Sequence, residues 1–336
     1  MTRPAWLAHF GSLRATLATM GLVAAVLVAR IVTDELWGWA LAIGFVAMAA
    51  NLVVALVVHP ALRQRLPLLI AHLAMLALVV LAGIGRMTSL DGRFELTQGL
   101  AFDGTLLDGR RGAWYRDRLG ALAFTHEHFD IEYAPGRKRG ATRNRVAWHD
   151  ADGTPRRAVI GDHRPLIIEG HRIYTSPNKG FAPLLRWQPS QGQPVLGSVH
   201  LPSFPVHELR QSQAWTLPDG REAWVMLRID DTLIDPARAT RFEMPREHRL
   251  IVRVDDVRAE LTPGGSIALP GGTLVYEGLR TWMGYRVSHD PTLPWLLAAS
   301  LLAALAMAWH YAAAFMRRSR TTTNPAATTN VARGIA

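Results

Sequence analysis

The feature that most constrains this chain is the apolar run Pro67–Gly85, which contains a single ionisable residue, His72. About twenty apolar residues in a helix cross a hydrocarbon core of ~30 Å, because each residue adds about 1.5 Å. A polar side chain at that depth is costly, and by default it indicates function. The run therefore predicts a membrane helix, and His72 is its candidate functional residue.

Apolar runs long enough to be spans lie at the two ends of the chain. We place them at Thr16–Val32, Leu36–Val58, Pro67–Gly85 and Pro294–Phe315. The predicted domains are an N-terminal membrane region (1–85), a β-rich outer domain (86–293), a C-terminal transmembrane helix (294–316) and a disordered tail (317–336). The predicted fold class is an α+β membrane protein with four transmembrane helices, three N-terminal and one C-terminal, and a β-rich extracytoplasmic domain.

The formal net charge of +10 would suit a nucleic-acid partner, but its distribution indicates topology instead. Residues 86–293 hold 28 Lys and Arg against 25 Asp and Glu, so the outer domain is close to neutral. Most other basic residues lie at the N-terminus, in the short loop that contains Arg63 and Arg65, and after the last span, whereas Asp34 and Glu35 lie in the other short loop. By the positive-inside pattern, both termini are cytoplasmic and the large domain is outside. We therefore expect no nucleic-acid partner.

The sequence of the outer domain predicts strands separated by Gly, Pro and Asp turn signals. The clearest is a hairpin around Asp152–Gly153, a strong turn dipeptide, and no segment shows a sustained helical period. We expect a β-rich sandwich or open barrel, with strands that include Phe94–Leu96, Leu122–Tyr133, Leu166–Ile168, Arg172–Tyr174, Ala223–Ile229, Leu250–Val254 and Gly272–Tyr276. The chain has no cysteine, which excludes thiol chemistry and a CxxCH haem attachment site in this chain.

Several local patterns occur in a recognisable order. The third span opens with His72 and ends in Gly83 and Gly85; the outer domain contains LGALAFTHEHFDIEY and RPLIIEGHRIYTS; and GYRVSHDP leads into the last span. In this order the chain resembles the ResB/CcsB family of cytochrome c biogenesis proteins. It departs from the family at Thr292, where members often have Gly after the Asp-Pro pair, and in an outer domain shorter than that of many members.

The resemblance implies a role in System II assembly of c-type cytochromes. In that role the chain works with a ResC/CcsA-type membrane partner to carry haem b across the membrane and present it to apocytochrome c. It implies a multi-pass protein of the bacterial inner membrane, with the large domain on the periplasmic side. The alternatives are a membrane scaffold that stabilises a partner without binding haem, and a sensor whose outer domain binds a ligand.

No nucleophile–base set, paired-carboxylate motif or phosphate loop is evident in the sequence. We therefore do not expect the chain to be an enzyme alone, although the resemblance makes it a candidate subunit of a holocytochrome c synthase complex. His72 is the candidate haem and metal ligand, because haem iron takes neutral imidazole as an axial ligand. The alternative is a histidine hydrogen-bonded across helices.

A second membrane histidine, His310, lies in the last span near the same membrane face as His72. It shares a helix face with a stripe of small residues, namely Ala299, Ala303, Ala306, Ala313 and Ala314. We hypothesise that it faces the bundle near His72, as a second haem ligand or an orienting partner. The alternative is an interfacial histidine beside Trp309 and Tyr311 in an aromatic belt.

His126 and His128 form an HxH pair in a predicted strand, which would direct both side chains to one face. Two imidazoles on one face can bind metal, but they make no zinc site without a third ligand. The alternative is a solvated strand face.

Overall fold

The computed structural model describes residues 9–32, 37–150 and 152–322. It divides into two units. We call the first the helical unit; it comprises the described residues up to Thr88, the segment Gly112–Trp114, and the residues from Asp290 onward. The second, the sheet unit, comprises Ser89–Arg111 and Tyr115–His289.

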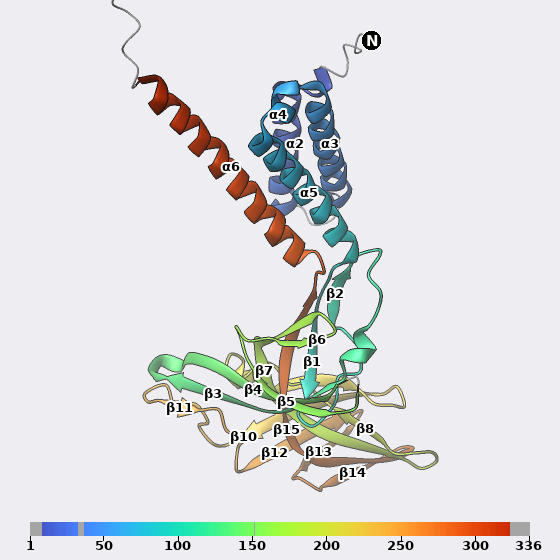
Figure 1. Cartoon of the computed structure of the whole chain (residues 1–336). Helices are drawn as coiled ribbons and strands as arrows, with labels where there is room; N and C mark the ends of the chain where they lie inside the picture. Colours follow the sequence, from blue (N-terminus) through green and yellow to red (C-terminus); the bar gives the residue numbers. More distant parts are fainter. Residues whose placement is uncertain (1–8, 33–36, 151, 323–336) are drawn as a thin grey trace, which may run out of the picture. The chain divides into compact units, whose positions relative to one another are not determined.

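The helical unit consists of α2 (Leu13–Val32), α3 (Trp37–Val58), the short α4 (Pro60–Gln64), α5 (Leu66–Thr88) and α6 (Leu293–Thr322), labelled in Figure 1. Within the described residues, three helical stretches are long and apolar enough to cross a membrane: Ala40–Val58, Leu66–Thr88 and Leu293–Met316. The apolar part of α2, Leu13–Ala29, is shorter. Three of the four predicted spans therefore coincide with helices long and apolar enough to cross a membrane, and within the described residues the first predicted span falls short of that length.

The last helix is longer than expected, because α6 continues to Thr322. The prediction of a disordered tail from residue 317 is thus wrong for residues 317–322, where Arg317, Arg318 and Arg320, all good helix formers, extend the helix. The remainder of the predicted tail, residues 323–336, lies outside the described residues, as do Asp34, Glu35 and Leu36.

Small residues bring the helices together. A Cβ on Gly44 of α3 would lie 2.7 Å from a methyl of Val23 on α2, and one on Gly85 of α5 would lie 2.6 Å from the Thr292 hydroxyl at the start of α6. Ala299 and Ala306 are buried on α6, which packs against α5. The helices of this unit therefore approach closely where side chains are small.

The strands of the sheet unit form three sheets within the described residues. The seven-stranded sheet contains β2 (Asp108–Arg111), β1 (Leu90–Thr97), β15 (Gly272–His289), β7 (His171–Pro189) and β6 (Leu166–Ile168) in that order, with β14 (Ser266–Leu269) on β15 and β8 (Val195–Ser198) on β7. One four-stranded sheet is β13 (Val257–Leu261), β12 (His248–Val254), β10 (Glu222–Ile229) and β9 (Ser212–Thr216); the other is β11 (Thr240–Arg241), β3 (Phe124–Ala134), β4 (Lys138–His149) and β5 (Pro155–Ile160).

The predicted hairpin around Asp152–Gly153 is confirmed by the antiparallel pairing of β4 with β5. Two predicted strands were much too short, however. Arg172–Tyr174 and Gly272–Tyr276 are the first parts of β7 and β15, which have 19 and 18 residues and pair along most of their length. Gly and Pro within them suggested strand ends, but the structure absorbs these residues in register shifts, as bulges do.

Aromatic rings from different sheets meet in one core. Phe94 of β1 stacks on Tyr285 of β15 at 5.2 Å between ring centroids, and Phe124 of β3, in another sheet, meets both rings edge-on, at 6.1 Å from Phe94 and 5.4 Å from Tyr285. Phe242 lies 4.9 Å from Phe129 of β3. Valines and leucines of β10 and β12 belong to the same buried cluster. The three sheets are therefore parts of one folding unit rather than separate domains.

Candidate functional site

His72 lies in the first turns of α5 and is half-buried. Its Nδ1–H donates to the carbonyl oxygen of Leu68, one turn earlier, at 2.7 Å. This bond fixes the tautomer, so Nε2 carries a lone pair, and Nε2 has no hydrogen-bond partner among the described residues. An imidazole oriented through Nδ1 by a backbone carbonyl is the usual arrangement of a histidine that ligates a metal through Nε2. His72 therefore fits the ligand role chemically.

His310 lies on the face of α6 that is turned toward other residues. Ala299 and Ala306 are buried, and Ala303, His310 and Ala313 are half-buried, at the spacing of one helix face. The described ring contact of His310 is with Tyr311, at 5.6 Å between centroids. No contact between His72 and His310 is recorded among the described residues. Their pairing stays a prediction.

The HxH pair does not behave as predicted. A register shift in β3 between His126 and His128 changes which side chains point inward. His126 is completely buried, whereas the His128 side chain is 41% exposed and lies beside Asp130. The two imidazoles therefore do not share a face, because a β-bulge breaks the two-residue alternation on which the prediction depended. Within the described residues no cluster of three or more potential ligands could hold a metal ion.

His126 instead belongs to a buried polar network. Its Nδ1 accepts from the side-chain amide of Asn144 at 2.8 Å, and the amide oxygen of Asn144 accepts from the Tyr285 hydroxyl at 3.1 Å. Burial, and secondarily the neighbouring His128, lower the pKa of His126 to about 3. The imidazole is therefore neutral at physiological pH, and it fastens β3, β4 and β15 to one another.

Two histidines that the sequence did not single out as a pair contact each other in the seven-stranded sheet: His171 at the start of β7 and His289 at the end of β15. His171 and His289 stack with ring centroids 4.4 Å apart. Nδ1–H of His171 donates to Glu169, its Nε2 accepts from Tyr115, and His289 Nδ1–H donates to the carbonyl of Gly170. Burial, followed by the charge of His289, lowers the pKa of His171. The only signal in the sequence was that both lie in segments quoted for the family resemblance.

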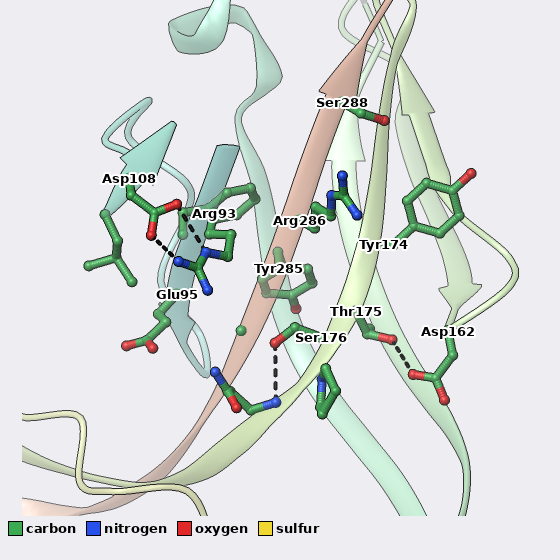
Figure 2. Close-up of a pocket in the computed structure, with 15 residues that line it drawn as sticks. Arg93, Glu95, Asp108, Asp162, Tyr174, Thr175, Ser176, Tyr285, Arg286 and Ser288 are labelled. Atoms are coloured by element: carbon green, nitrogen blue, oxygen red, sulfur yellow. Dashed lines mark hydrogen bonds and ion pairs between the residues drawn. The ribbon is translucent and has the colours of Figure 1, made fainter. Parts of the chain in front are cut away.

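A polar cleft of about 770 Å³ opens where β1, β7 and β15 run side by side (Figure 2). Its wall includes Arg93, Glu95 and Arg286, with Asp162 and Thr175 joined by a hydrogen bond of 3.1 Å on the other side. Arg93 donates to Asp108 through Nε at 3.0 Å. The cleft thus combines paired charges and hydroxyl and amide groups with apolar side chains such as Phe94 and Leu107.

The cleft has its shape because of one glycine. Opposite Gly284 of β15, the chain of β7 bulges outward at residues 176–178, since Tyr285 pairs with Thr175 and Met283 with Lys179. A Cβ on Gly284 would lie 2.4 Å from the Ser176 hydroxyl oxygen, so only glycine fits beneath the bulge.

The buried lysine at the end of the bulge holds it in place. Lys179 is 3% exposed and its Nζ donates to the carbonyl of Pro177 at 3.2 Å. Burial, with the nearby Arg139 charge as the next cause, lowers its pKa to about 8. Sequence reasoning missed this residue, because a lone lysine in a polar segment resembles a surface residue.

No protein-family model matches the chain, and no curated protein matches it. The resemblance to the ResB/CcsB family therefore rests on the sequence motifs described above.

Proposed function

We propose that this chain is a ResB-like subunit of cytochrome c biogenesis in the bacterial inner membrane. With a ResC/CcsA-type partner it carries haem across the membrane and presents it to apocytochrome c. In this proposal α2, α3, α5 and α6 all span the bilayer and the sheet unit is periplasmic. The observation that carries the proposal is the geometry of His72, whose Nδ1–H is held by Leu68 while Nε2 keeps its lone pair.

The connectivity supports a route from one side to the other. His72 lies at the start of α5, and the same helix continues directly into β1 of the sheet unit. By the charge pattern, the start of α5 is cytoplasmic, so His72 belongs to the end where haem is received. The sheet unit belongs to the end where haem is handed on, and its polar cleft is where we place a segment of apocytochrome c.

The proposal is tested by His72→Ala in a strain that also expresses the partner. We expect the purified complex to lose its Soret band by about tenfold or more, and a reporter cytochrome c to remain immature. The matched control is His59→Ala, which removes a histidine that lies outside α5 and whose Nε2–H donates to the carbonyl of Gly11 at 3.0 Å. His310→Ala then shows whether the second histidine shares the haem.

The scaffold alternative makes the opposite forecast. If the His72→Ala complex keeps both its Soret band and normal cytochrome maturation, haem handling by this residue is excluded. If deletion of the whole chain then lowers only the amount of the partner, the chain is a scaffold.

A further inference from the structure

An apolar groove of about 480 Å³ lies within the helical unit, between α3 and the last turns of α5. Phe45, Ala49, Val80 and Gly83 line it, and Arg86 and Trp114 lie with them among its lining residues. Small residues on both helices leave this space open. A Cβ on Gly83 would meet no atom within 4 Å, so this position borders empty space rather than a packed neighbour.

The tryptophan is held in place by the backbone. The segment Gly112–Trp114 docks on the end of α5, where the backbone N–H of Trp114 donates to the carbonyl of Met87 at 2.7 Å. A Cβ on Gly112 would lie 2.2 Å from the same carbonyl oxygen, so residue 112 must be glycine for the segment to lie this close to the end of α5. Trp114 nevertheless remains 64% exposed. An exposed indole whose backbone is anchored at the end of an apolar helix is typical of the boundary between hydrocarbon and headgroups.

Arg86 supplies a charge at the same end. It is the basic residue of the last turn of α5, and its side chain is exposed. Its guanidinium has no ion pair or hydrogen bond among the described residues, unlike Arg93 a few residues later, which pairs with Asp108. A planar guanidinium binds phosphate oxygens in a bidentate manner, so an unpaired arginine beside an apolar groove complements an anionic amphiphile.

We propose that this groove binds an anionic phospholipid of the outer leaflet, with one acyl chain between α3 and α5 and the phosphate on Arg86. Trp114 then lies at the level of the headgroup and covers the upper part of the chain. The inference rests on the membrane placement of these helices proposed above, but it requires neither haem nor a cytochrome. The charge of Arg86 selects the headgroup, and the apolar wall accepts the tail.

The experiment compares lipids retained by the full-length protein purified from membranes in mild detergent. The protein is incubated with equal amounts of phosphatidylglycerol and phosphatidylcholine, and bound lipid is counted by native mass spectrometry. We expect phosphatidylglycerol to be preferred about fivefold. Arg86→Gln removes this preference while some lipid of both kinds stays bound. Gly83→Leu fills the groove and reduces retention of both lipids.

The matched control is Arg63→Gln, which removes a basic residue from α4 and leaves the preference unchanged. Helical circular dichroism of each variant confirms that the fold persists. Equal retention of the two lipids by the wild type, or an unchanged preference in Arg86→Gln, overturns the proposal. Capture of a partner helix in place of lipid, abolished by Gly83→Leu, also overturns it. Recovery of the wild type outside the membrane fraction rejects the membrane placement itself, which separates that failure from failure of the lipid site.

Discussion

Asn51 of the helical unit and Phe94 of the sheet unit are 1% and 2% exposed, yet they stabilise their surroundings in different ways. Asn51 accepts from the hydroxyl of Thr16 on α2 at 2.7 Å and donates to the carbonyl of Phe10. Phe94 packs against other aromatic rings. In the membrane placement proposed above there is no hydrophobic driving force between the helices, so close packing and polar contacts hold them together. In water, burial of apolar surface dominates.

The histidines follow the same division. Several imidazoles of the sheet unit are bound into the structure: His200, for example, lies 2.8 Å from both Glu95 and Thr97 and stacks on Trp282. His72 in the helical unit has one orienting hydrogen bond. Side chains that are fully engaged stabilise a fold, whereas one left with a free lone pair is available for chemistry.

The largest effect should come from the aromatic core. Phe94→Ala removes a ring that stacks on two others, and we expect the free energy of unfolding of the sheet unit to fall by about 3–5 kcal/mol. Denaturant unfolding followed by tryptophan fluorescence measures it. Leu209→Ala, at a position that is 97% exposed, is the control and should leave the transition in place. An unchanged midpoint in Phe94→Ala would show that the core does not carry the stability.

Acid should destabilise the sheet unit more than the helical unit. The pKa of His126 is about 3 when folded, against an ordinary value of 6.5, because burial disfavours the charged form. The unfolded chain therefore binds the additional proton first. The stability contribution is fully present above pH 6.5 and is lost progressively as the pH falls from there toward 3. Between pH 7 and 5 the loss is about 2 kcal/mol.

His126→Gln should flatten this dependence between pH 7 and 5. The exposed neighbour provides the control, since His128→Gln should retain the slope. His171 and His248, whose pKa values are also lowered by burial, leave a smaller residual slope in His126→Gln. Thermal melts at half-unit pH intervals measure the dependence, and identical slopes for the wild type and His126→Gln would contradict the assignment.

In the helical unit, Asn51→Ala should cost about 1 kcal/mol, less than the loss of a core ring from the sheets, because interhelical hydrogen bonds in membranes are modest. Thr19→Ala is the control, since the Thr19 hydroxyl donates only to carbonyls of its own helix. Helical circular dichroism during unfolding in mixed micelles measures the difference. A loss as large as that of Phe94→Ala would remove the distinction between the two units.

The smallest effect should come from the exposed ion pair of Arg93 with Asp108 at the cleft. Both side chains are more than half exposed, so solvent screens their attraction. We expect Arg93→Ala to leave the unfolding midpoint unchanged while altering any peptide binding to the cleft, measured by calorimetry with apocytochrome peptides. A clear drop in stability would mean that the pair belongs to the structural core after all.

Local sequence predicts some features of this protein and misses others. The apolar helices, the hairpin at Asp152–Gly153 and the strand around Phe94 follow from periodicity and turn chemistry, which act over a few residues. The lengths of β7 and β15 do not, because glycine and proline are compatible with a strand when a distant partner accommodates a bulge. The same physics misled the HxH prediction.

By itself, the sequence determined an α+β chain with long apolar helices at its ends, a β-rich middle without cysteine, and an ionisable His72 within an apolar helix. These depend on composition and on short-range pattern. Only the tertiary structure decided that Nδ1 of His72 is held by Leu68, that His126 and His128 point apart, and that His171 meets His289. Such outcomes depend on register and on contacts between residues far apart in the chain, which no local pattern contains.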